Sequence, residues 1–122
     1  MNLLVVAVII VIIVLTAIKI MKPKLTICLF YATWCGYCKE YLKAGTFDIA
    51  YNRVKSNPDF KGVEFKKFNA DNYKSLIKKY NIIAFPTIIA IDGEKNKLSE
   101  FTGDRDKPED LLTFVKKCLS NK

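Results

Sequence analysis

The sequence contains no histidine, and this absence removes much catalytic chemistry. Without an imidazole there is no Cys-His or Ser-His nucleophile pair and no histidine-ligated metal. The signature of covalently attached haem is excluded as well, because Lys39 follows Cys38 where that signature needs histidine. The reactions open to this chain are correspondingly few.

Cysteines are scarce too, and the chain has four of them: Cys28, Cys35, Cys38 and Cys118. They are too few and too unevenly spaced for the disulfide framework of a small secreted domain. A structural zinc site would need a second close pair, and the long gap from Cys38 to Cys118 does not supply one. We therefore expect no metal and no cofactor.

Acidic residues are outnumbered, because 12 Asp and Glu stand against 20 Lys and Arg, for a net charge of +8. The basic residues form no tract longer than a pair such as Lys66–Lys67, and such pairs are typical of a solvated surface. Nucleic acid is therefore not an expected partner. With 122 residues, the chain has room for one domain.

An uncharged apolar run extends from Leu3 to Ile18. As a helix it would reach about 24 Å, and flanking residues bring it close to a bilayer core of about 30 Å. The alternative, a cleaved signal peptide, would need basic residues before the run and a small residue in place of Leu15. The pattern predicts a transmembrane anchor over residues 1–21, with residues 3–21 in the lipid bilayer, a basic linker over 22–24 and a soluble domain over 25–122.

The charges around this run predict the topology of the chain. Lys19, Lys22 and Lys24 all lie on its carboxyl side, so the positive-inside rule places the domain in the cytoplasm or its topological equivalent, such as a virion interior. The exported side is the alternative, because a hydrophobic segment at the start of a chain often exports the domain after it. We expect a single-pass membrane protein whose domain is a monomer.

After the anchor, the hydrophobic pattern predicts an α/β domain with a mixed sheet between helices. Leu25–Ala32 is a nearly continuous apolar run, typical of a buried central strand. The turn after it holds Cys35 and Cys38 and opens a helix, which Gly45 and Thr46 interrupt, with Thr46 capping the next helical segment. The further elements expected are strands at Val63–Phe68, Thr87–Ile91 and Lys97–Phe101, a helix at Asp71–Tyr80 and a last helix starting near Pro108.

The spacing of Cys35 and Cys38 supports reversible disulfide chemistry. Residues three apart share one helix face, so the two thiols can close a disulfide. The start of the helix lowers the pKa of Cys35 and favours its thiolate, which makes Cys35 the attacking sulfur. Cys38 lies one turn deeper, keeps a more ordinary thiol and resolves the mixed disulfide by attacking Cys35.

Two segments resemble thioredoxins and protein disulfide isomerases. Tyr31–Lys39, which reads YATWCGYCK, is similar to their active-site segment, and Tyr80–Thr87, which reads YNIIAFPT, looks like their cis-proline segment. The resemblance implies a thioredoxin fold. It also implies that Pro86 faces Cys35 in a cis peptide and that the Phe85 backbone hydrogen-bonds an extended substrate segment.

The same resemblance implies roles for the residues beside the cysteines. Trp34 would cover the site as an apolar lid, and Gly36 and Tyr37 form the interior of the pair. Residue type alone leaves two alternatives open, namely an ordinary core aromatic at Trp34 and a trans proline in a loop at Pro86.

The chain also departs from the family pattern. Leu29 stands where thioredoxins carry a buried acid near the second cysteine, so no evident residue deprotonates Cys38, although Lys67 resembles the lysine that accompanies the acid. The two remaining cysteines, Cys28 and Cys118, are interpreted as small apolar residues.

The sequence supports two functional hypotheses. The first is a membrane-anchored thiol-disulfide oxidoreductase that exchanges disulfides with protein disulfide or dithiol substrates, reducing them in the cytoplasm and oxidising or isomerising them if exported. The second is a redox-silent binding module, tethered to a membrane, that uses the groove beside Pro86, and it is motivated by Leu29 in place of the acid.

Overall fold

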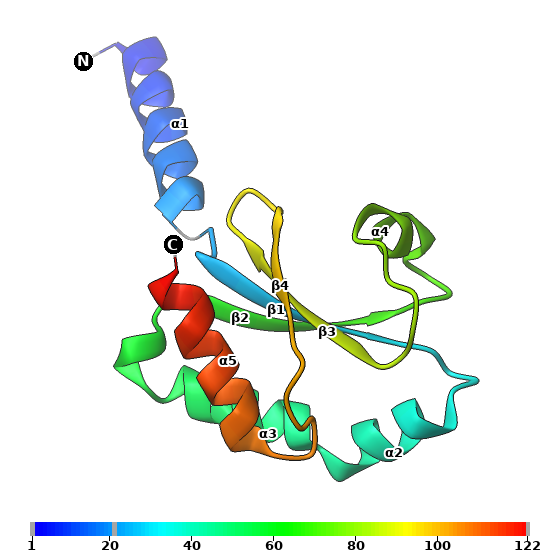
Figure 1. The fold of residues 1–122 in the computed structure, drawn as a ribbon. Coiled ribbons are helices and arrows are strands. Elements are labelled where there is room, and N and C mark those ends of the chain that lie inside the picture. The colour runs from blue at the N-terminus through cyan, green and yellow to red at the C-terminus, as the bar shows by residue number, and fades with distance from the viewer. Residues whose placement is uncertain (1, 21, 122) are drawn as a thin grey trace.

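The computed structural model describes residues 2–20 and 22–121, apart from the side chains of residues 17–20 (Figure 1). An amino-terminal helix precedes a four-stranded sheet with its connecting helices. The elements are α1 (Leu3–Ile20), β1 (Leu25–Tyr31), α2 (Gly36–Ala44), α3 (Thr46–Lys55), the 3-10 turn η1 (Pro58–Phe60), β2 (Val63–Asn69), α4 (Lys74–Lys79), β3 (Thr87–Asp92), β4 (Lys97–Glu100) and α5 (Pro108–Ser120).

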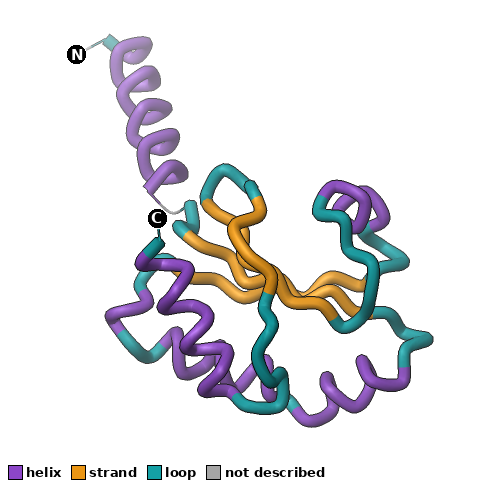
Figure 2. The backbone as a smooth tube through the Cα atoms, in the orientation of Figure 1, coloured by secondary structure: helices purple, strands orange, loops and turns teal. Residues whose placement is uncertain are grey.

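The sheet has the strand order β2-β1-β3-β4 and is mixed, as predicted (Figure 2). β1 pairs in parallel with β2 and antiparallel with β3, and β3 pairs antiparallel with β4. Each predicted strand is present, and its ends differ from the prediction by one residue at most. β1 is therefore the buried central strand that its apolar run predicted, with a neighbour on each side.

Alternate side chains of β1 face two separate cores, because successive residues of a strand point to opposite faces. Leu25, Ile27 and Leu29 pack with α3 and α5 in the larger core. Cys28 and Phe30 point the other way and pack against the segment around α4. Figure 1 shows α3 and α5 together on one side of the sheet and α4 on the other.

The helix α4 is shorter than predicted. It begins at Lys74 rather than Asp71, because residues 69–73 form a hydrogen-bonded turn. In this turn the Asn69 side chain accepts a hydrogen bond from the Asp71 N–H at 3.1 Å, and the Asn72 N–H donates to the Asn69 carbonyl at 3.0 Å. Local side-chain hydrogen bonds of this kind compete with helix formation. Within the described residues, the helix that packs on the second face of the sheet consequently has six residues.

The predicted break between α2 and α3 is confirmed at Gly45. This residue has φ 72°, a left-handed conformation that glycine adopts without steric cost, and its N–H bonds to the Leu42 carbonyl. The prediction that Thr46 caps α3 is wrong. Gly45 occupies the cap position, and Thr46 is the first helical residue and is buried.

The predicted transmembrane anchor at residues 1–21 finds no support. Within residues 2–20 and 22–121, no helix combines the length and apolar character that crossing a membrane requires. Met1 and Met21, which the prediction includes, lie outside the described residues.

Candidate active site

Cys35 lies in the turn between β1 and α2, directly before the first residue of the helix. Its backbone is extended, with φ −94° and ψ 117°, and its sulfur takes the cap position of α2 by accepting a hydrogen bond from the Cys38 N–H at 3.3 Å. The Cys35 N–H donates to the Ala32 carbonyl at 3.2 Å. The predicted opening of a helix by the cysteine pair is thus confirmed.

The surroundings of Cys35 lower its pKa. The largest contribution is the side-chain hydrogen bond with Cys38, followed, after an opposing contribution from desolvation, by backbone hydrogen bonds from Cys38 and Tyr37 and by the charge of Arg105. The backbone donors are the unpaired N–H groups of the first helical turn, which stabilise an anion. The direction agrees with the sequence-based expectation, and the principal cause is the second thiol of the pair.

Cys38 is not the ordinary thiol that the sequence predicted. Its side chain is fully buried, and burial raises its pKa to about 11, with a further increase from the hydrogen bond to Cys35. Both cysteines are free thiols in this structure. The two thiols therefore differ in pKa, and Cys35 is the one that ionises first as the pH rises.

A loop from a distant part of the chain completes the surroundings of Cys35. The Phe85–Pro86 peptide bond is cis, and the Cys35 thiol donates to the Phe85 carbonyl at 3.6 Å. The Trp34 ring meets the Phe85 ring edge-on, with 5.9 Å between centroids. Trp34 is 70% exposed, so the core-aromatic interpretation of this residue is wrong.

The interior residues of the pair are open to solvent. Gly36 begins α2, and a Cβ placed on it would have no atom within 4 Å. Tyr37 is 79% exposed. Their side-chain positions therefore present surface next to Cys35 and do not contribute to the core.

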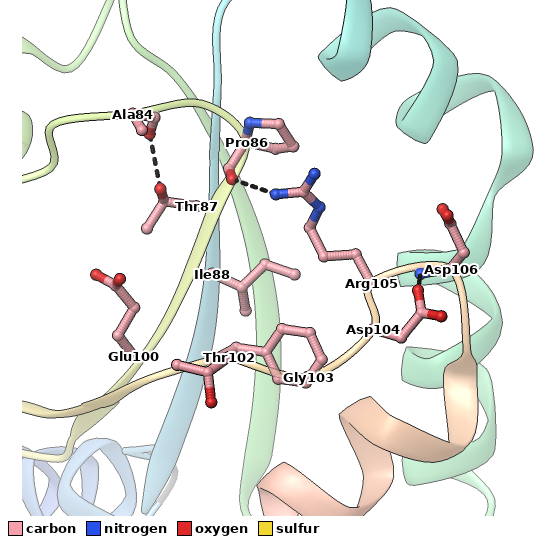
Figure 3. Close-up of a pocket in the computed structure, with 11 residues that line it drawn as sticks. Ala84, Pro86, Thr87, Ile88, Glu100, Thr102, Gly103, Asp104, Arg105 and Asp106 are labelled. Carbon is pink, nitrogen blue, oxygen red and sulfur yellow. Dashed lines mark hydrogen bonds between the residues drawn. The ribbon is translucent and has the colours of Figure 1, made fainter.

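Arg105 is a member of this site that the sequence reasoning missed. Its guanidinium donates a hydrogen bond to the Pro86 carbonyl at 3.0 Å, and its charge lowers the pKa of both Cys35 and Cys38. Figure 3 shows the guanidinium directed at that carbonyl. Both residues line a cavity of about 460 Å³. Its signal in the sequence was a lone basic residue between two acids in the loop before α5.

The carboxylate that the family would place beneath Cys38 is indeed absent. Leu29 is fully buried and lies opposite Lys67 in the register of β1 and β2. Lys67 instead pairs with Asp48 of α3, at 2.8 Å between nitrogen and oxygen. Near the cysteines, burial raises the pKa of Tyr41, and in the part of the chain that the structure describes its hydroxyl is the buried side-chain polar atom without a hydrogen-bond partner.

Cys28 and Cys118 lie apart from this pair, on separate elements. Both are buried, as expected for small apolar residues, and burial raises the pKa of Cys28 to about 12. Among the described residues, no group of three or more cysteines and carboxylates is placed to hold a metal ion.

The two pKa shifts predict different alkylation profiles for the paired cysteines. Because the thiolate is the reacting species, we expect iodoacetamide to modify Cys35 at neutral pH, with a rate that levels off below its ordinary pKa of 9.0. The rate at Cys38 should still be rising toward pH 11. Peptide mass spectrometry of briefly labelled protein measures both, and coincident profiles would contradict the assignment.

Known proteins resemble this chain in sequence over most of its length. The thioredoxin family model matches residues 16–117. A protein disulfide-isomerase of Schizosaccharomyces pombe is 35% identical over 89 residues, which cover 72% of this chain and 23% of that protein. A protein disulfide isomerase-like protein of Oryza sativa is 34% identical over 95 residues, which cover 75% of this chain and 20% of that protein. The chain thus spans about a fifth to a quarter of the length of these relatives.

Solved structures resemble the fold. The zinc-bound form of human ERp44 matches 81% of this chain and 28% of its own chain, with a TM-score of 0.68 and 20% identity, a likeness that concerns the fold alone. The germline-specific thioredoxin Deadhead of Drosophila melanogaster matches 84% of this chain and 88% of its own, with a TM-score of 0.61 and 25% identity.

Proposed function

Because this chain belongs to the thioredoxin family, we propose that it is a thiol-disulfide oxidoreductase that exchanges disulfides with polypeptide substrates through Cys35 and Cys38. One observation carries the proposal. Cys35 has a lowered pKa and is partly exposed beside the Phe85 carbonyl, whereas its partner Cys38 is buried with a raised pKa. Two sulfurs held at unequal pKa are what sequential attack and resolution require.

The reaction balances with the two thiols and the substrate alone. The Cys35 thiolate attacks one sulfur of a substrate disulfide, forms a mixed disulfide and releases the other substrate sulfur as a thiolate, which takes up a proton. Cys38 then loses its proton and attacks Cys35, which closes the Cys35–Cys38 disulfide and releases the second substrate thiol. The reverse sequence oxidises a substrate dithiol and reduces the pair.

The surroundings of Cys35 supply a place for the substrate backbone. The Phe85 carbonyl now accepts a hydrogen bond from the Cys35 thiol, and it loses that donor when the thiol ionises. It can then accept an N–H from an extended substrate segment next to the sulfur. Trp34 packs on the Phe85 ring and remains exposed, so it offers an apolar surface to the same segment.

A trapping experiment tests this function. In a Cys38→Ala variant the second step cannot occur, so we expect a covalent complex through Cys35 with a disulfide-containing substrate such as insulin, stable without reductant and released by dithiothreitol. The matched control, Cys118→Ala, should form no such complex. A Cys38→Ala protein that captures nothing would favour the redox-silent binding module instead.

We further propose that α1 attaches the domain to a membrane, with the domain on the cytoplasmic or an equivalent side. Support comes from the absence of charge between Leu3 and Ile18 and from the exposure of every described α1 side chain. Contiguous exposed apolar surface marks an interaction site. The basic residues Lys19, Lys22 and Lys24 on its carboxyl side support the orientation.

Fractionation tests the attachment. We expect the full chain to remain in the membrane pellet after alkaline carbonate extraction, and a variant with Ile9→Lys and Ile12→Lys to move to the supernatant. Protease added outside sealed cells or vesicles should leave the domain intact. Digestion of the domain in those conditions would assign the exported side, and chains that lack their first residues would point to a cleaved signal.

A further inference from the structure

A second cavity, of about 280 Å³, lies away from the cysteine pair. Its floor is formed by Thr26 and Cys28 of β1, on the sheet face opposite α3 and α5. The cavity walls are apolar or aromatic side chains, Phe68, Leu76, Tyr80 and Ile91. It is therefore a mainly apolar hollow that the proposed redox chemistry does not use.

The cavity exists because the second face of the sheet is thinly covered. On this face α4 supplies Leu76 and Ile77, and its six residues do not extend across the strands. The opposite face carries two helices of 10 and 13 residues, α3 and α5. Figure 1 shows this asymmetry, with α4 on one side of the sheet and α3 and α5 together on the other.

The rim of the cavity carries an excess of positive charge. Lys22, Lys66 and Lys95 line it, against the two carboxylates of Glu64 and Asp92. The Asp92 carboxylate already accepts the N–H groups of Glu94 and Asn96 in the hairpin turn, each at 2.9 Å.

Two of these three lysines are available to pair with an anion. Within the described residues neither Lys66 nor Lys95 forms an ion pair, and Lys22 forms one, with Glu94 at 3.4 Å. Lys66 lies close enough to act electrostatically on the Cys28 thiol at the floor.

We propose that this cavity binds a small anionic amphiphile, a medium-chain carboxylic acid whose tail occupies the hollow between Phe68, Tyr80 and Ile91 and whose carboxylate pairs with Lys66 and Lys95. Pockets for drug-sized ligands occupy about 300–1,000 Å³. This cavity lies just below that range, so its volume limits the ligand to a small molecule with a single tail. Charge complementarity sets the sign of the head group.

The thiol of Cys28 reports on occupancy without any variant. We expect sodium decanoate, below its micelle-forming concentration, to slow the modification of Cys28 by methyl methanethiosulfonate in the full chain. The slowing should reach roughly fivefold when decanoate stands at about four times its dissociation constant. Peptide mass spectrometry resolves each cysteine. Cys118 is the internal control, because it is also buried but lies in α5, in the larger core on the opposite face of the sheet.

Three comparisons make the result decisive. Decylammonium has the same tail and the opposite charge, and it should protect Cys28 weakly or not at all. The variant Lys66→Gln with Lys95→Gln should lose the protection by decanoate, whereas the matched surface variant Lys116→Gln with Lys117→Gln should keep it. Equal protection by both amphiphiles, equal protection of Cys118, or no protection of Cys28 overturns the proposal.

The readout is independent of the proposed oxidoreductase activity. It measures the modification of Cys28, which lies in the smaller core on the α4 side of the sheet. It requires no turnover by Cys35 and Cys38. A chain that fails to reduce insulin can still bind decanoate, and one that reduces insulin can fail to bind it. The two proposals are therefore tested independently of each other.

Discussion

Replacing Cys35 with serine abolishes disulfide exchange, because the hydroxyl does not ionise at neutral pH and cannot form a mixed disulfide. We expect the rate of insulin reduction with dithiothreitol to fall by roughly a thousandfold or more, the order of loss that follows removal of an attacking nucleophile. The fold should survive, since Cys35 is only partly buried and belongs to no core cluster.

The control for this variant is Cys118→Ala, which removes a thiol from α5, an element that supplies no residue to the site. Its insulin reduction should remain within about twofold of the unchanged chain, provided that thermal melts show it folded. Retention of substantial activity by Cys35→Ser would contradict the assignment of Cys35 as the attacking sulfur. Loss of activity in the folded Cys118→Ala protein would place a second thiol in the reaction.

Replacing Phe30 with alanine should destabilise the domain more than any other single truncation on the α4 side of the sheet. Phe30 is fully buried in β1, and its ring lies 5.2 Å from that of Phe68 and 6.3 Å from that of Tyr80. Truncation of a buried phenylalanine costs about 3–5 kcal/mol of unfolding free energy, through lost burial and the void left behind.

Urea denaturation followed by circular dichroism measures this effect. We expect the midpoint of Phe30→Ala to fall strongly with little change in the slope, as for a loss of stability without a change of native compactness. The matched aromatic control is Tyr37→Ala, whose ring is 79% exposed and should cost less than about 1 kcal/mol. A Phe30→Ala cost as small as that of the control would contradict the packing described for this core.

The attacking part of the site could be predicted because it is local in sequence. The strand, turn and helix that carry Cys35 and Cys38 occupy consecutive residues, so the spacing and the helix start suffice. The contact between the Cys35 thiol and the Phe85 carbonyl joins residues fifty positions apart. Only the resemblance to a family, and not the pattern of residues, could bring those two together.

Other features depended on packing that no local pattern reveals. The raised pKa of Cys38 follows from its complete burial on the inner side of α2, which helical spacing alone does not fix. Arg105 reaches the site because the loop before α5 brings its guanidinium to the Pro86 carbonyl. At Trp34, residue type favoured neither core nor surface, and the edge contact with Phe85 leaves most of the ring outside.

The strand order has a consequence for how the protein behaves at high concentration. β2 and β4 are the outer strands of the sheet, and each leaves backbone donors and acceptors available to another chain. Lys66 and Lys67 in β2 and Lys97 in β4 bring charge to these borders. Charged side chains on an outer strand oppose edge-to-edge pairing with the sheet of another molecule, and so they protect the domain against fibre-like self-association.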